Sequence, residues 1–272
     1  MRYRVEKHHL TADGHRMKLY VLRPALLLPG GAPGVLWIHG GGYVIGMSEM
    51  VFLSRAMDLV KSYGAVVVSP EYRLAGQAPY PAALHDCYEA LLYLLRHAEE
   101  LSVRRDQIMV GGESAGGGLT AALCMYARDR NEVRIAYQMP LYPMLDSRDT
   151  PSSAHNHAPV WNTRRNHWGW RHYLRNLSSS EVPYYASPAR CTDYSGLPPA
   201  YSFVGDIEPF YCETLAYIEN LKAAGVEAAV DIYPGCFHAF DMLRPDLPVS
   251  KQAIRAFNAR FEYAMTHYFS DN

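Results

Sequence analysis

Short runs of apolar residues, each bounded by glycine or proline, recur along most of this chain. Runs of four to eight apolar residues between such turn residues are typical of strands that are buried on both faces of a sheet. The sequence predicts strands of this kind at residues 34–39, 65–69, 107–111, 135–141, 200–204 and 228–233. The residues that precede the first of them also favour strands, as at 15–23.

The segments between these strands carry apolar residues at intervals of three and four, which is the spacing of one face of an α-helix. The residues with this spacing are Leu84, Tyr88, Leu91, Leu92 and Leu95, then Leu215, Ile218 and Leu221, and finally Ile254, Phe257 and Phe261. Parallel strands need long crossover connections, so strands that alternate with helices predict an α/β fold. We therefore expect a mostly parallel central sheet with helices on both faces.

Residues 146–185 interrupt this alternation. They are rich in Trp, His, Asn and Arg, and they show no strand pattern. The sequence contains no internal repeat, low-complexity tract or flexible linker that would divide it into independent parts. We therefore predict a single domain over residues 1–272, with residues 146–185 as a small helical cap inserted into it.

The charge balance argues against two classes of partner. Lys and Arg together number 26 and Asp and Glu 27, which leaves no positive excess to neutralise nucleic acid or an anionic membrane. Residues 1–10 are charged throughout, and no later segment is apolar over the length of a bilayer. The five cysteines are scattered without metal-binding spacing, which favours isolated thiols. We expect a cytoplasmic protein that binds neither nucleic acid nor membranes.

A candidate nucleophile lies at residues 112–116, Gly-Glu-Ser-Ala-Gly, between a predicted strand and an apolar helical segment. A serine hydroxyl becomes nucleophilic when a sharp strand-to-helix turn presents it to a base, and glycines two residues on either side relieve the crowding of such a turn. A bare GxSxG pattern arises by chance in about one chain in ten of this length. The strand-turn-helix context, more than the motif, therefore predicts Ser114 as the nucleophile.

A second motif, His-Gly-Gly-Gly at residues 39–42, follows the first predicted core strand. Acyl transfer places negative charge on the carbonyl oxygen, and backbone N–H groups of a glycine loop can stabilise it. The residue after the nucleophile, Ala115, would supply another N–H. The alternative is a tight turn in which His39 caps the strand.

A base and an acid should follow the serine in the order serine, acid, histidine. His238 lies just past the last predicted strand and is the candidate base. Asp206 and Glu208 both follow the preceding strand, and either could hold the imidazole in the tautomer that accepts the serine proton. These positions leave the acid open between the two.

Together these motifs resemble the hormone-sensitive-lipase-type esterases of the α/β-hydrolase fold. The resemblance runs from about residue 35 to residue 238 and rests on His39-Gly-Gly-Gly-Tyr, Tyr72-Arg-Leu, Pro79 with Pro81-Ala-Ala, Gly112-Glu-Ser-Ala-Gly-Gly, Pro188-Ala, Leu197-Pro-Pro-Ala and Tyr233-Pro-Gly. It implies that Glu208 is the acid, because Glu208-Pro-Phe falls where the family has Asp followed by Pro or Leu and an apolar residue. It also implies Gly41 and Gly42 as oxyanion donors alongside Ala115.

The chain departs from the family pattern at several positions. Glu208 stands where Asp is usual, Tyr211 and Cys212 where Arg and Asp are common, and Ala239 where Gly usually follows the histidine. Because of the first departure, Asp206 remains a candidate for the acid. The other departures indicate an unusual subgroup of the family.

The expected activity is that of a serine carboxylesterase that acts on small-molecule esters with short acyl chains and needs no cofactor or metal. Short chains are expected because the cap is small and no apolar run suggests a lipid-binding lid. An amidase or arylformamidase on the same fold remains open, as does a non-catalytic ligand-binding homologue, although such receptors have lost the histidine that here is His238. The oligomeric state is also open, a homodimer included.

Three further sets of residues have roles that the sequence suggests, and two of these sets allow two interpretations. The cap aromatics could line an acyl pocket or form the buried face of a helix: Trp161, Trp168, Trp170 and Tyr173. The cap histidines could bind metal, but we expect them in solvent because neither an acidic partner nor a fixed spacing accompanies them: His155, His157, His167 and His172. Arg73 and Asp86 are expected to support the loop above the sheet.

Overall fold

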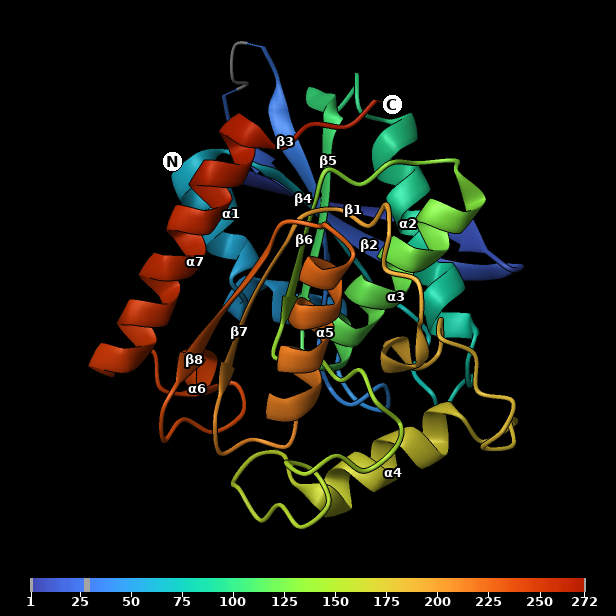
Figure 1. The fold of residues 1–272 in the computed structure, drawn as a ribbon. Coiled ribbons are helices and arrows are strands. Elements are labelled where there is room, and N and C mark those ends of the chain that lie inside the picture. The colour runs from blue at the N-terminus through green and yellow to red at the C-terminus, as the bar shows by residue number, and fades with distance from the viewer. Residues whose placement is uncertain (1, 27–29, 272) are drawn as a thin grey trace.

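The computed structural model describes residues 2–26 and 30–271, and within them a single eight-stranded sheet crosses the molecule (Figure 1). Its strands are β1 (Tyr3–Ala12), β2 (His15–Pro24), β3 (Ala32–Ile38), β4 (Val66–Pro70), β5 (Val103–Glu113), β6 (Tyr137–Leu141), β7 (Ala200–Gly205) and β8 (Ala228–Tyr233). Their order is β1-β2-β4-β3-β5-β6-β7-β8. The hairpin β1–β2 is antiparallel and joins β4 antiparallel, whereas β3 to β8 run parallel. The predicted mostly parallel α/β fold is confirmed.

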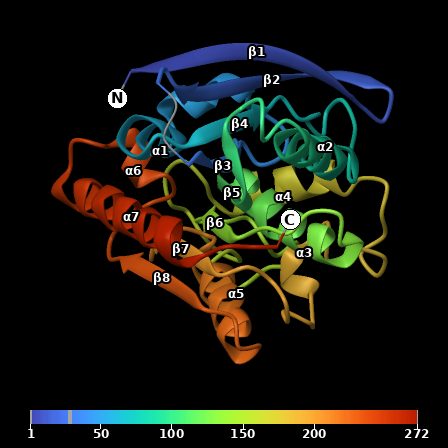
Figure 2. The same ribbon diagram turned by 90° about the horizontal axis from the view of Figure 1, so that it is seen from above.

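Helices cover both faces of the sheet, as Figure 2 shows. One face packs under α1 (Ala56–Tyr63), α6 (Phe240–Leu243) and α7 (Pro248–His267). The other packs under α2 (Ala82–Arg96), α3 (Ala115–Arg130) and α5 (Tyr211–Ala223). Two short 3₁₀ helices lie at Ser48–Leu53 and Pro188–Arg190.

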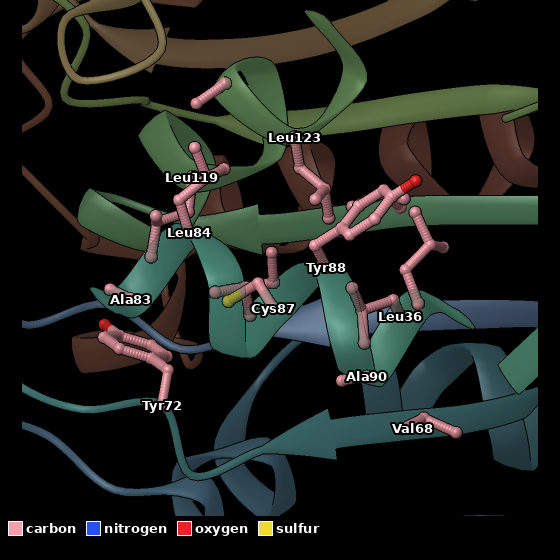
Figure 3. Packing of buried hydrophobic residues seen from close by; sticks show 14 of the residues in the cluster. Leu36, Val68, Tyr72, Ala83, Leu84, Cys87, Tyr88, Ala90, Leu119 and Leu123 are labelled. Atoms are coloured by element: carbon pink, nitrogen blue, oxygen red, sulfur yellow. The ribbon is translucent and has the colours of Figure 1, made fainter. Parts of the chain in front are cut away.

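The central strands are buried on both faces, which explains their continuous apolar runs. Successive side chains of β3 point to opposite faces: Leu36 and Ile38 pack toward α2 and α3, while Val35 and Trp37 pack toward α1 and α7. Figure 3 shows the first of these layers, with Leu36 beside residues of both helices. Side chains of β3 and β5 are packed on both faces of the sheet. Both strands end at the edge of the sheet where the glycine loop and Ser114 follow them.

Residues 146–185 lie between β6 and β7 and contain α4 (Thr163–Tyr173), which passes beyond the carboxyl ends of the parallel strands (Figure 1). The end of α4 is anchored to the rest of the molecule by Tyr173. Its ring stacks on Tyr43 with centroids 4.0 Å apart, and its carbonyl accepts a hydrogen bond of 2.9 Å from the Tyr80 N–H. These contacts fix α4 over the edge of the sheet. The division of the chain into one domain and an inserted cap stays a prediction.

Two further observations concern membrane-spanning helices and the cysteines. Across residues 2–26 and 30–271, no helix is both long and apolar enough to cross a membrane. All five cysteines fall within these residues and are free thiols, which confirms that prediction.

Candidate active site

Ser114 lies in the turn between β5 and α3, with φ of 59° and ψ of −121°. Positive φ is strained for a residue with a side chain, and such strain is typical of functional turns. The turn also lies against β3. A Cβ atom at Gly112 would come within 2.5 Å of the Ile38 carbonyl oxygen, and one at Gly116 within 2.0 Å. Both glycines are therefore needed for the close approach that presents Ser114.

His238 follows β8, and its ring is held beside Ser114. The Ser114 hydroxyl can donate to the ring because Oγ lies 2.9 Å from His238 Nε2. Tyr142 and Phe210 meet the imidazole edge to face, each with ring centroids 5.0 Å away, and leave it 3% exposed. Ala239 adopts φ of 59°, in the left-handed region that favours glycine. That conformation accounts for the glycine which the family usually has after the histidine.

The structure brings Glu208, and not Asp206, to His238. Glu208 is fully buried, and its Oε2 accepts a hydrogen bond from His238 Nδ1. Its Oε1 accepts a second hydrogen bond, 3.1 Å long, from the Gly205 N–H. The exposed side chain of Asp206 instead accepts a 2.7 Å hydrogen bond from the Gly235 N–H. Glu208 can therefore orient the imidazole, while Asp206 stabilises the turn that leads to it.

The loop at residues 39–42 is anchored by His39. Burial lowers the pKa of this histidine, which favours the neutral ring, and its Nδ1 donates to the Gly40 carbonyl at 2.8 Å. Tyr72 stacks on the ring and donates from its hydroxyl to the His39 carbonyl at 2.9 Å. His39 thus fixes the start of the glycine loop.

The glycines of this loop adopt backbone conformations that side chains disfavour, with φ of 120° at Gly41 and 60° at Gly42. Among the described residues, neither N–H group donates a hydrogen bond to the protein. Ala115 is the first residue of α3, so its N–H has no acceptor within the helix. These N–H groups remain available to a substrate oxygen.

A cavity of about 900 Å³ opens over Ser114 and His238. Most of the side chains in its wall are apolar, and two of the predicted cap aromatics, Trp161 and Trp168, are among them. The other two lie elsewhere: Trp170 and Tyr173 are buried against Tyr43 in the core. The four aromatics thus divide between the two interpretations that the sequence allowed.

The sequence analysis missed a buried pair of carboxyl groups beneath the nucleophile. Glu113 Oε2 accepts a 2.8 Å hydrogen bond from the Trp37 indole, and Asp241 accepts one of 3.1 Å from the Tyr142 hydroxyl. Arg55 Nε lies 3.3 Å from Asp241 Oδ2. Burial, reinforced by nearby Asp241, raises the pKa of Glu113 to about 8, and burial also raises that of Asp241. The only sequence signal was the place of Glu113 within the serine motif.

The remaining predicted residues have structural positions. Arg73 pairs with buried Asp86 through Nη2 and Oδ1 at 2.7 Å, and the Arg73 N–H also donates to this carboxylate at 2.8 Å. These contacts join the loop after β4 to α2, which agrees with the predicted structural role. The four cap histidines are exposed or half-buried, as expected. The expectation that they have no acidic partner was wrong for His167, whose Nε2 lies 2.7 Å from Asp149 Oδ1.

All parts of the site lie at the carboxyl ends of parallel strands, where open α/β sheets place their ligands. Ser114 follows β5, Gly41 follows β3, Glu208 follows β7 and His238 follows β8. The hydroxyl, the imidazole and the carboxylate are linked by hydrogen bonds and lie beside free N–H groups. This arrangement is suited to acyl transfer.

Comparison with known proteins points the same way. A family model described as alpha/beta hydrolase fold matches residues 35–242. Esterase LipI of Mycobacterium tuberculosis is 32% identical over 82% of this chain and 70% of its own length. An ethyl acetate hydrolase of Pseudomonas putida is 28% identical over 85% of this chain and 73% of its own. Among solved structures, a bacterial heroin esterase superposes with a TM-score of 0.85 at 36% identity, covering 93% of this chain and 82% of that one.

Proposed function

Because this chain belongs to the α/β-hydrolase family, and within it to the hormone-sensitive-lipase type of carboxylic ester hydrolase, we propose that it hydrolyses short-chain acyl esters through Ser114, His238 and Glu208. The observation that supports this most is the 2.9 Å contact between Ser114 Oγ and His238 Nε2 in the wall of an apolar cavity. The similar proteins LipI and the bacterial heroin esterase are named as esterases, which supports a catalytic protein over a non-catalytic one.

In the proposed reaction, Ser114 Oγ attacks the ester carbonyl while His238 Nε2 takes the hydroxyl proton. Glu208 accepts the Nδ1 proton in a hydrogen bond, which leaves Nε2 free as the base and stabilises the imidazolium. The imidazolium then returns the proton to the departing alcohol, and the acyl group remains on Ser114. Water, deprotonated by the same ring, releases the acid and restores the serine.

We propose that the N–H groups of Gly41, Gly42 and Ala115 donate hydrogen bonds to the negatively charged oxygen of the tetrahedral intermediate. The positive φ of both glycines and the first-turn position of Ala115 support this assignment. Hydrogen bonds from fixed N–H groups stabilise the oxyanion more than the neutral carbonyl of the substrate, which is the condition for catalysis.

Trp161 supports the preference for short acyl chains. A Cβ atom on Gly42 would lie 2.2 Å from Cη2 of this indole, so the ring presses against the proposed oxyanion loop. Its ring centroid also lies 6.4 Å from that of His238. A bulky indole this close to the oxyanion loop and to His238 leaves little room for a long acyl chain on the side of the cavity that Trp161 lines. The similar protein from Pseudomonas putida is named for ethyl acetate, a two-carbon acyl ester.

The proposed nucleophile can be tested with a fluorophosphonate, which phosphonylates an activated serine. We expect one adduct on the peptide that contains Ser114, located by mass spectrometry after digestion of the labelled native protein. Heat-denatured protein serves as the control, because labelling requires the folded arrangement of Ser114 and His238. Labelling at another serine, or none in the native protein, would contradict the assignment.

The acyl preference can be tested with 4-nitrophenyl esters from acetate to laurate. We expect kcat/KM to be highest between acetyl and hexanoyl and to fall by about 10-fold or more for the long chains, since each misfitting group costs on the order of 1–3 kcal/mol. Trp161→Ala should move the optimum to longer chains, whereas Trp170→Ala, a buried control on the same segment, should not. A laurate optimum in the unmodified protein would refute the proposal.

A further inference from the structure

Two cations from α4 line the cavity that holds the nucleophile. Arg164 and Arg165 project from the first turn of this helix, and both belong to the cavity wall together with Ser114. Arg165 is engaged, because its guanidinium donates to the Val160 carbonyl. For Arg164, the described residues offer neither an ion pair nor a hydrogen bond to its side chain. Among residues 2–26 and 30–271, this guanidinium in the cavity wall therefore has no partner.

The acidic groups near the cavity do not neutralise Arg164. The only acidic side chain in the described wall is Glu113, which is hydrogen-bonded to Trp37 and whose pKa burial raises to about 8. The rest of the wall is mainly apolar, including Trp161 and Trp168. Arg164 is exposed, so water partly screens its charge, but no ionised acidic side chain of the described wall competes with an anion for it.

The position of Arg164 is unfavourable for the helix itself. The amino-terminal turn of a helix carries partial positive charge and favours acidic residues, but the first turn of α4 has none and has two arginines. Arg171, in the last turn of the same helix, is placed where the helix favours a cation. A sequence that breaks a local rule at a ligand cavity is expected to do so for function.

From these observations we propose that the natural substrate is an ester that carries a second, negatively charged group, a carboxylate, and that Arg164 binds this carboxylate while Ser114 attacks the ester. The cavity of about 900 Å³ has room for an ester with such an extension. Arg164 is thus a specificity-determining residue. This inference rests on the proposed esterase function and adds the substrate class to it.

The test compares anionic and neutral esters of matched size. In one pair the carboxylate ends the acyl chain, mono(4-nitrophenyl) adipate against 4-nitrophenyl hexanoate. In the other it is on the leaving group, 4-acetoxybenzoate against its methyl ester. We expect the anionic ester of one pair to have about 10-fold higher kcat/KM, mainly through a lower KM, because a contact remote from the reacting atoms binds the ground and transition states alike. The pair in which the anionic ester is preferred shows whether the carboxylate belongs to the acyl group or to the leaving group.

Matched variants assign the effect to Arg164. Arg164→Met keeps the length of the stem and should remove the preference, while Arg164→Lys should retain part of it because a point charge cannot bind a carboxylate bidentately. Arg171→Met is the control, since Arg171 is an exposed arginine of the same helix outside this cavity. It should leave the preference unchanged, and added salt should weaken the preference in the unmodified protein.

The outcomes separate this inference from the proposed function. Turnover of the neutral esters with a ratio near one in both pairs would overturn the inference alone. A preference that persists in Arg164→Met would also overturn it. Failure to hydrolyse any of the four esters would overturn the proposed function, and this inference with it.

Discussion

Changing Glu208 to glutamine is expected to lower kcat about 10⁴-fold. The Glu208 carboxylate accepts a hydrogen bond from the Nδ1–H of His238, which leaves Nε2 unprotonated and facing Ser114. A glutamine amide can instead donate to Nδ1 and hold the proton on Nε2, so the imidazole can no longer accept the serine proton. The loss is measured as kcat with 4-nitrophenyl acetate.

Asp206→Asn is the matched control for this substitution, because it also removes one carboxylate from the same loop. Its expected effect on kcat is within a few-fold, since the Asp206 side chain is exposed and, in the part of the chain that the structure describes, accepts a hydrogen bond only from the Gly235 N–H. Thermal unfolding of both variants shows whether the buried substitution has disturbed the fold. If Asp206→Asn cripples a stable enzyme and Glu208→Gln does not, the acid is Asp206.

The acid also shows where sequence reasoning ends. Both Asp206 and Glu208 follow β7, and the order of residues along the chain does not determine which one turns inward. In the structure Glu208 is fully buried while Asp206 is exposed on the turn to Gly235. That difference arises from the path of the loop in three dimensions. The family resemblance favoured Glu208, and its position beside His238 agrees with that choice.

The parallel strands were the most predictable part of the fold, because burial on both faces gives each an unbroken apolar run. Even there the boundaries shifted: β5 begins at Val103, before the predicted 107, and β6 begins at Tyr137, after the predicted 135. Helix α1 was not predicted, since its eight residues are too few to show a clear period.

The buried carboxyl pair beneath Ser114 could not be predicted. Glu113 and Asp241 lie far apart in sequence, at the end of β5 and in α6, and only the folded chain brings the two carboxyl groups near enough to interact electrostatically. Spacing along the chain carries no information about such a meeting. By contrast, the glycine loop and the serine turn were predictable because each is a local backbone problem that only glycine solves.

Gly41→Ala is expected to lower kcat by about 10²–10³-fold, the usual cost of losing one oxyanion donor. The added methyl group would lie 1.9 Å from the Ile45 carbonyl oxygen, and φ of 120° is unsuited to alanine. Because the obstacle is backbone, the loop must move, and its N–H groups move with it. The loss is measured with 4-nitrophenyl acetate, and the affinity for a boronic acid that forms a tetrahedral adduct with Ser114 should fall in parallel.

The control for backbone strain is Gly14→Ala, in the turn between β1 and β2. Gly14 also has a positive φ, 74°, but an added Cβ would have no described atom within 4 Å. This variant should lose some stability and keep its kcat. If Gly41→Ala lowers the melting temperature as Gly14→Ala does but retains full kcat and boronate affinity, then the loop only shapes the fold. Loss of both kcat and boronate affinity in Gly41→Ala, with both retained in Gly14→Ala, would mean that the N–H groups of the loop stabilise the negative charge of the intermediate, because the strain of a positive φ is present in both variants.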